Sequence, residues 1–223
     1  MPELLAVIFD LDGVIVSTDD YHYRGWKRLA DEIGVPFDRR RNERLRGIDR
    51  MNSLRRLLPE NHGYSEAELQ ALATRKNEYY KELIQQVSPR DLLPGVPALL
   101  DDLDAHRVRK AIASASKNAG EVLERLGIGR RFEVVVTGHD FTHGKPAPDI
   151  FLTAARRLTL PPVNCLVVED AVSGVEAGVA AGMKVLGRGS DPDLVKAGAA
   201  RMVESLAEVT CADLARLLAA CRT

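Results

Sequence analysis

A short apolar run near the start of the chain ends at two aspartates, and this junction constrains the fold more than any other feature. Residues 4–9 are all apolar, and the sequence D-L-D-G follows at residues 10–13. A run that is apolar at every position is typical of a strand buried on both faces of a parallel sheet. Asp10 and Asp12 are two residues apart, so in extended backbone both point the same way beyond the carboxyl end of that strand.

Two carboxylates placed this close together need something to offset their charge. Like charges at short range repel unless a cation lies between them or one carboxyl group keeps a proton. Open α/β sheets bind their ligands at the carboxyl ends of the strands, where Asp10 and Asp12 are expected. The pair therefore indicates a Mg²⁺ site, proton transfer, or both. Taken alone, the same residues also suit a solvated turn.

Short apolar runs recur along the chain at intervals that suit alternating strands and helices. They lie at 110–113, 134–137, 165–168 and 184–187. Helical patterns separate them, such as residues 120–126 and 147–158. This alternation predicts an α/β fold with a doubly wound, Rossmann-like parallel sheet. After Asp191 we expect a helix, a short edge strand near 201–204 and a final helix at 212–220.

The alternation breaks after the first strand, where only helical patterns occur. Apolar positions repeat at helical spacing in residues 21–33, 51–58 and 65–86. We therefore expect an α-helical cap domain, inserted after the first strand at residues 17–91. The core domain would consist of residues 1–16 and 92–223. Two connections between the domains would permit hinge motion.

Composition argues for an ordinary soluble protein with small-molecule ligands. The formal net charge is −1, so we expect no general attraction to nucleic acid or to an anionic membrane. No signal peptide or membrane-spanning run is visible, and we expect a cytoplasmic protein. Cys165, Cys211 and Cys221 lack metal-ligand spacing, which suits reduced thiols. Nothing marks an oligomer interface, so a monomer is the default expectation.

Three further polar clusters follow the predicted strands. They are Ser114-Ala115-Ser116, Lys145 within the sequence K-P-A-P-D, and the acidic pair Glu169-Asp170. Singly, each suits a helix cap, a surface lysine or the start of a loop. The carboxyl ends of parallel strands share one edge of the sheet, however, so all three clusters can converge on the aspartates. Convergence of four polar clusters favours an active site.

Phosphoryl transfer needs the groups that these clusters supply. It requires a nucleophile, an acid/base for the alcohol oxygen, and positive charge on the phosphoryl oxygens. Asp10 is the candidate nucleophile and Asp12 the candidate acid/base. Ser114 and the backbone N–H of Ala115 could bind the phosphoryl group, while Lys145 places a positive charge beside it. A Mg²⁺ ion could be held by Asp10, by the backbone carbonyl of Asp12, and by Glu169 and Asp170.

At this point the chain resembles the haloacid dehalogenase superfamily, in its phosphotransferase branch with a helical cap. The resemblance rests on D-x-D-G at residues 10–13, on Ser114, on Lys145 and on the pair at 169–170. It implies the sheet order 3-2-1-4-5, which places the first and fourth strands side by side. The dehalogenases of the superfamily lack the second aspartate, so Asp12 favours phosphoryl transfer over halide chemistry.

Within that superfamily the chain is similar to the β-phosphoglucomutase family in both core and cap. The matching segments are 10–15, 21–27, 45–54, 75–77, 114–118 and 145–151. The resemblance implies that Arg50 binds the second phosphate of the substrate, and that Thr18 and His22 lie by the hinge and orient Asp12. The sugar site would be lined by Trp26, Arg46, Gly47, Ser53, Lys76, Ser116, Lys117 and Asn118. Without the resemblance, a packed histidine and solvated helix charges would explain the cap residues.

Two positions depart from the family's usual pattern. Arg46 stands where lysine is usual, and Ala171 follows the acidic pair where serine is common. A planar guanidinium is not equivalent to an ammonium at a close polar contact. Neither change touches an expected catalytic group, so both bear on substrate preference rather than on the reaction.

The resemblance implies a phosphomutase that interconverts β-D-glucose 1-phosphate and D-glucose 6-phosphate. The reaction would pass through an aspartyl-phosphate enzyme, with β-glucose 1,6-bisphosphate as activator and intermediate and one Mg²⁺ per site. A Mg²⁺-dependent sugar-phosphate phosphatase with the same core is the main alternative. A non-catalytic sugar-phosphate sensor is a third reading, but such a sensor would usually have lost the nucleophile or a metal ligand. Asp10, Asp12 and Asp170 are all present.

Overall fold

The computed structural model describes residues 3–45 and 47–220, and its core is a sheet of parallel strands. In space the strands lie in the order β3-β2-β1-β4-β5-β6, and each neighbouring pair is parallel. They are β1 (Ala6–Phe9), β2 (Arg109–Ala113), β3 (Val134–Val136), β4 (Cys165–Glu169), β5 (Lys184–Arg188) and β6 (Arg201–Val203). The expected order 3-2-1-4-5 is confirmed, and the expected edge strand joins it beside β5.

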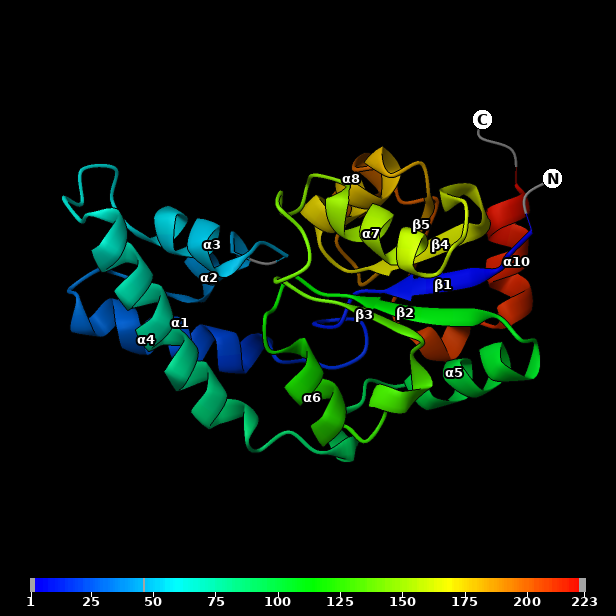
Figure 1. Ribbon diagram of the computed structural model, residues 1–223, viewed down its shortest axis with the longest axis horizontal. Coiled ribbons are helices and arrows are strands. Elements are labelled where there is room, and N and C mark those ends of the chain that lie inside the picture. Colours follow the sequence, from blue (N-terminus) through cyan, green and yellow to red (C-terminus); the bar gives the residue numbers. More distant parts are fainter. Residues whose placement is uncertain (1–2, 46, 221–223) are drawn as a thin grey trace.

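Helices cover both faces of this sheet. They are α5 (Val96–Ala105), α6 (Ala119–Arg125), α7 (Asp149–Arg157), α8 (Val172–Ala180), α9 (Asp193–Lys196) and α10 (Cys211–Ala219). Figure 1 shows α7 and α8 on one side of the strands and α5 and α6 on the other. In β1, Val7 and Phe9 belong to one hydrophobic cluster, and Ala6 and Ile8 belong to the other. The uninterrupted apolar run of β1 thus reflects burial on both faces.

In the described residues, four helices lie between β1 and α5, and we call them the cap. They are α1 (Asp19–Glu32), α2 (Arg39–Glu43), α3 (Arg50–Leu57) and α4 (Glu66–Ile84). Figure 1 shows them beyond the carboxyl ends of the strands. The cap has its own hydrophobic cluster, which includes Trp26, Leu29, Leu54, Leu69 and Leu72. The short helix α2 was not predicted, because its five residues are too few to show an apolar repeat and only Asn42 among them is buried.

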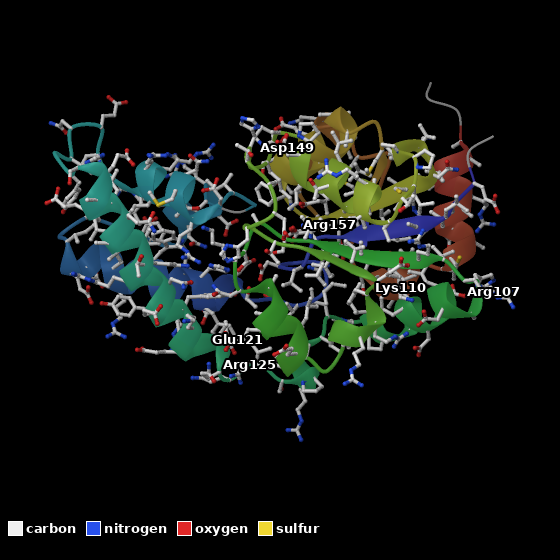
Figure 2. All side chains as sticks on the ribbon, in the orientation of Figure 1. Arg107, Lys110, Glu121, Arg125, Asp149 and Arg157 are labelled. Carbon is white, nitrogen blue, oxygen red and sulfur yellow. The ribbon has the colours of Figure 1, made fainter. Side chains whose placement is uncertain are left out.

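The carboxyl end of α4 ties the cap to the core. Tyr80 and Ile84 belong to a hydrophobic cluster of the sheet rather than to that of the cap. The Gln85 side-chain amide donates to Glu121 Oε1 at 2.9 Å, and Arg125 donates to the Gln85 backbone carbonyl at 3.1 Å. Figure 2 shows Glu121 and Arg125 on α6, the core helix that lies next to this end of α4.

Short 3₁₀ helices join several of these elements. They are η1 (Pro89–Asp91), η2 (Gly129–Arg131), η3 (Pro162–Asn164) and η4 (Leu206–Glu208). The first of them leads from the cap back into the core, where the Leu93 amide donates to the Ile15 carbonyl at 2.9 Å. The two chain connections between cap and core therefore run side by side. In the part of the chain that the structure describes, no helix is long and apolar enough to cross a membrane.

Two glycines with positive φ should differ sharply in their tolerance of a side chain. Gly95 is the N-cap of α5 with φ +86°, and a methyl group there would overlap the backbone of Ala207. Gly34 follows α1 with φ +69° and has no atom within 4 Å of that position. Gly34→Ala should therefore lower the free energy of unfolding by roughly 1 kcal/mol, the cost of the left-handed conformation alone. Gly95→Ala should lower it by roughly 3 kcal/mol or more.

Urea denaturation of the two variants measures this difference. Equal losses in Gly34→Ala and Gly95→Ala would contradict the close approach of η4 to the start of α5.

Candidate active site

A cavity of about 380 Å³ lies between the cap and the carboxyl ends of the strands. This volume is within the range of small-molecule sites. The lining residues that the sequence had indicated are Asp10, Asp12, His22, Trp26, Gly47, Arg50, Ser53, Lys76, Ser114, Ala115, Ser116, Lys117, Asn118 and Asp170. Figure 1 shows β1, with its carboxyl end turned toward the cap. The convergence expected at this edge of the sheet is therefore observed.

Three buried charges form the floor of the site. Lys145 Nζ donates to both Asp10 Oδ1 and Glu169 Oε1. The side chains of Lys145, Asp10 and Glu169 are 0%, 9% and 1% exposed. Burial raises the pKa of Asp10 to about 6, although Lys145 opposes the shift. Burial would lower the pKa of Lys145, but the two adjacent carboxylates raise it overall, so this ammonium stays charged.

The backbone after β4 holds Glu169 in place. Glu169 Oε2 accepts from the backbone N–H groups of Asp170 and Ala171 at 2.7 and 2.9 Å. The carboxylate also lies against Gly174 in the first turns of α8, where any Cβ would overlap it. Glycine at this helical position therefore makes room for a buried carboxylate.

A chain of polar contacts runs from Asp12 into the cap. Thr18 Oγ1 donates to Asp12 Oδ1, and His22 Nε2 lies 4.0 Å from Asp12 Oδ2. On the other side of the imidazole, Lys76 Nζ lies 3.0 Å from His22 Nδ1. A charged lysine can only donate at that nitrogen, so beside a charged Lys76 a neutral His22 would carry its proton on Nε2, toward Asp12.

Burial shifts the pKa of Asp12, His22 and Lys76, the titratable groups in this series of polar contacts. It raises the pKa of Asp12 well above its ordinary value, and the charge of Asp10 adds to the shift. It lowers the pKa of His22 well below its ordinary value, with further lowering by Lys76 and Arg50. It also lowers the pKa of Lys76 well below the lysine norm. Asp12 is therefore able to keep a proton closer to neutral pH than an ordinary aspartate, while His22 stays neutral.

Aromatic rings contact His22 and Lys76, the two residues at the cap end of this series of polar contacts. The His22 ring stacks on Tyr80 with centroids 4.1 Å apart. Lys76 Nζ lies 4.7 Å from the centre of the Trp26 ring and 4.8 Å from that of Tyr80. Such cation–π contacts partly replace the water that a buried ammonium loses. The side chains of α1 and α4 thus form one rigid wall of the cavity.

The turn after β2 forms a second wall. Ser114 is buried at the end of the strand, and its Oγ accepts from the Ser116 backbone N–H at 3.1 Å. Ser116 Oγ accepts in turn from the backbone N–H of Asn118 at 3.2 Å. The Asn118 side chain donates to Asn77 Oδ1 on α4 at 2.8 Å, so core and cap are bonded to each other at the cavity itself.

The start of α3 brings a cation into the cavity from the cap. Arg50 is the first residue of this helix, and Asp49 caps it by accepting from the Asn52 N–H at 3.1 Å. Burial lowers the pKa of Arg50, a sign that its guanidinium is partly removed from water. Gly47 lies close to the core, because a Cβ there would be 2.7 Å from Ser173 Oγ and 3.0 Å from Ala171 Cβ. The departure at Ala171 therefore falls where the cap meets the core.

The remaining indicated residues lie just behind the cavity surface. Thr18 contacts Asp12, and Lys145 and Glu169 reach the cavity through Asp10. Arg46 falls outside the described residues. The structure thus brings together every indicated site residue that it describes, while the roles assigned to them stay predictions.

Sequence reasoning missed several polar residues that also line the cavity. They include Asn42, Asp49, Asn52, Gln70, Asn77 and Thr142. A signal existed for α4, because Gln70 and Asn77 lie seven residues apart, close to two helical turns, and so share a face. No such signal existed for Asn42, whose helix was not predicted.

The donor set at this edge fits a magnesium ion. Asp10, Asp12 and Asp170 all line the cavity, and all offer the hard oxygen atoms that Mg²⁺ prefers. Within residues 3–45 and 47–220, no three side chains of His, Cys, Asp or Glu already converge on one point. Magnesium sites commonly use one or two carboxylates and complete their octahedron with other oxygens. Zinc favours sulfur and imidazole ligands; the described lining contains no cysteine, and its imidazole, that of His22, lies between Asp12 and Lys76.

Comparison with known proteins agrees with this geometry. A family model described as haloacid dehalogenase-like hydrolase matches residues 4–182. β-Phosphoglucomutase of Bacillus subtilis (strain 168) is 43% identical over 208 residues, which cover 92% of this chain and 91% of that protein. A phosphorylated carbohydrates phosphatase of Thermotoga maritima is 32% identical over 181 residues, covering 80% of this chain and 82% of that protein.

Solved structures give the same result. The crystal structure of β-phosphoglucomutase from Clostridium difficile superposes with a TM-score of 0.92 at 38% identity, covering 98% of this chain and 97% of that one. The resemblance to β-phosphoglucomutases inferred from the sequence is therefore confirmed. The family model spans most of the chain, and the chain belongs to the haloacid dehalogenase-like hydrolase family.

Proposed function

We propose that this protein is a phosphomutase that interconverts β-D-glucose 1-phosphate and D-glucose 6-phosphate. The observation that supports this most is a cavity with positive charge both behind its core end and, separately, on its cap side. Lys145 lies behind Asp10 at the core end, and Arg50 enters from the cap. A phosphatase needs only the first position, whereas a mutase must also hold the phosphate that is not being transferred.

Asp10 would transfer the phosphoryl group. One Asp10 carboxylate oxygen attacks phosphorus, a bond forms between them, and the bond from phosphorus to the sugar oxygen breaks. Lys145 and the donors around Ser114 offset the negative charge of the phosphoryl oxygens. In the reverse step a sugar hydroxyl attacks the aspartyl phosphate and releases Asp10.

Asp12 would move the proton that balances each transfer. It gives its proton to the departing sugar oxygen, and it takes a proton from the sugar hydroxyl that attacks in the return step. Its raised pKa suits this exchange, because the protonated form persists closer to neutral pH. Thr18 and His22 would orient its carboxyl group.

We further propose a Mg²⁺ ion held by Asp10, Asp170 and the backbone carbonyl of Asp12, with Glu169 supporting a bound water. When bound, the ion would offset charge on the phosphoryl oxygens. It would also relieve the repulsion between Asp10 and Asp12. Without the ion, this repulsion adds to the effect of burial in raising the pKa of Asp12.

The reaction also needs an intermediate that turns around. The phosphoenzyme would convert β-glucose 1-phosphate to β-glucose 1,6-bisphosphate, which reorients and returns its other phosphoryl group to Asp10. Arg50 would hold the phosphate that is not reacting, while Ser116, Lys117 and Asn118 would line the sugar site. The cap would exclude water, which would otherwise hydrolyse the aspartyl phosphate.

The phosphatase reading keeps specific support, because the Thermotoga maritima relative is named a phosphorylated carbohydrates phosphatase. Both activities need the same core residues, so the cap decides between them. A cytoplasmic location, a monomeric state and the lack of nucleic-acid ligands stay predictions from the sequence.

³¹P NMR of the enzyme with Mg²⁺, a trace of β-glucose 1,6-bisphosphate and either anomer of glucose 1-phosphate tests the proposal. The β-anomer should give glucose 6-phosphate, and the α-anomer should not react. Inorganic phosphate as the main product would favour the phosphatase, and no turnover of the β-anomer would overturn the assigned sugar.

Replacing Arg50 should harm the mutase reaction selectively. Arg50→Met should lower kcat/KM for β-glucose 1,6-bisphosphate by about 10- to 100-fold, the loss expected for hydrogen bonds to a charged group. Hydrolysis of a small phosphate ester such as p-nitrophenyl phosphate should change little. Arg56→Met is the matched control, because Arg56 lies on the same helix and its exposed side chain donates to the Arg44 carbonyl. Equal losses with both substrates would count against a second phosphate position.

The pH profile should reveal the coupling between the cap and Asp12. Activity that needs protonated Asp12 falls as pH rises through its pKa. The charge of Lys76 lowers that pKa, so Lys76→Met should raise it and move the alkaline limb of kcat to higher pH. Lys81→Met, at an exposed position on the same helix, should leave the limb in place. A limb that does not move in Lys76→Met would refute the coupling.

A further inference from the structure

An arginine on β5 reaches the turn that carries Asp12. Arg188 is the last residue of β5, and its NH1 donates to the backbone carbonyl of Gly13 at 2.9 Å. In the sheet, β5 adjoins β4, and β4 adjoins β1. The contact therefore joins the carboxyl ends of two strands that are not neighbours, across the end of the strand that bears Glu169 and Asp170.

The turn itself is tightly folded. Gly13 has φ +83°, and its N–H donates to the Val16 carbonyl at 2.6 Å. The N–H groups of Ile15 and Val16 donate to the Leu11 carbonyl at 2.9 and 3.1 Å. These bonds fold residues 11–16 into a compact turn between β1 and the cap.

Two bonds on either side of Gly13 fix the direction of the Asp12 carbonyl. In a trans peptide the C=O of one residue points opposite to the N–H of the next, so the bond from Gly13 N–H to Val16 sets the Asp12 C=O. The next peptide plane is held by Arg188 through the Gly13 carbonyl. Without Arg188, that second plane would keep the long bond from the Val14 N–H to the Leu11 carbonyl, at 3.4 Å, and this weak restraint would let the plane turn and take Gly13 and Asp12 with it.

The same turn also packs against the acidic pair after β4. The Asp170 carboxylate lies so close to Gly13 that a Cβ there would overlap Asp170 Oδ2. Any shift of Gly13 would therefore move the surface on which Asp170 rests. The position of Arg188 thus bears on two groups of the site at once, the Asp12 backbone and the Asp170 side chain.

The guanidinium of Arg188 is suited to this role by its surroundings and its chemistry. Among the described residues, its half-buried side chain makes no salt bridge, and it donates a hydrogen bond to the Gly13 carbonyl. A guanidinium keeps its charge at all ordinary pH values and presents its donors in a fixed plane. A lysine could supply the charge, but its single ammonium lacks this fixed geometry.

We propose that Arg188 is a positioning residue for divalent-cation binding, which acts by holding the turn of residues 11–16 against β4. The inference rests on the proposed function to the extent that it takes Asp10, Asp12 and Asp170 as the Mg²⁺ site. Arg188 lies outside the lining of the cavity and is not expected to contact the sugar phosphate.

Direct binding of Mn²⁺ to the whole protein, followed by electron paramagnetic resonance, tests this proposal without relying on turnover. Arg188→Met keeps most of the side chain's length but removes the donor, and should weaken Mn²⁺ binding about tenfold, as losses of groups that orient metal ligands do. Arg188→Lys should weaken it less. At saturating Mg²⁺, KM for the sugar phosphate should stay near the wild-type value.

Arg109→Met is the matched control. Arg109 is also half-buried and also donates to a backbone carbonyl, that of Leu158 at 2.6 Å, but it lies at the start of β2, at the other end of the sheet. Its loss should lower stability without changing Mn²⁺ affinity. Mn²⁺ affinity within twofold of wild type in Arg188→Met would overturn the proposal, as would an equal loss in Arg109→Met.

The two proposals can fail separately. Mn²⁺ affinity does not depend on which phosphate ester reacts, so a phosphatase product in the NMR experiment would leave the role of Arg188 intact. If Arg188→Met does not fold, Arg188→Lys decides the question by the same measurement. A wild-type protein that binds no Mn²⁺ would overturn the role of Arg188 and the proposed metal together.

Discussion

The contact of Lys145 with Asp10 and Glu169 is the interaction on which the rest of the site depends. One ammonium faces two carboxylates in a region almost closed to water, so the cluster keeps an excess of negative charge. Burying three charges costs free energy that the ion pairs only partly return. In the function we propose, this cluster binds a further cation and a phosphoryl group, and it is not a source of stability. Burial raises the pKa of Asp10 to about 6, which reflects this cost to its charged form.

The fold holds these carboxylates close together. Parallel strands bring Asp10 and Glu169 to adjacent strand ends, and glycines at 13 and 174 leave space for the carboxylates of Asp170 and Glu169. The cap then extends the site away from the sheet. Its contacts run from Asp12 through His22 to Lys76, so a change in cap position would alter the surroundings of Asp12 directly. In the mechanism we propose, closure of the cap over the substrate therefore also positions Asp12, the proposed acid/base.

Much of this arrangement could be predicted from the sequence, because its strongest signals are local. The apolar run of β1 and the aspartates after it lie within ten residues, and each polar cluster follows a strand of similar character. What could not be predicted depends on contacts between distant segments. Asn77 matters because it accepts a hydrogen bond from Asn118, far away in the sequence. Arg188 matters because it donates to the Gly13 carbonyl from the other side of β4. The requirement for glycine at 174 likewise appears only once α8 is packed against Glu169.

The most direct test of the account is to look for a phosphoryl group on Asp10. The wild-type protein would be mixed with Mg²⁺ and β-glucose 1,6-bisphosphate, quenched in acid within a single turnover, and digested for mass spectrometry. We predict one phosphate per chain, on the peptide that contains Asp10, labile to hydroxylamine and absent from Asp10→Asn. A phosphate found on another residue, or a protein that turns over without any covalent phosphate, would contradict the central claim.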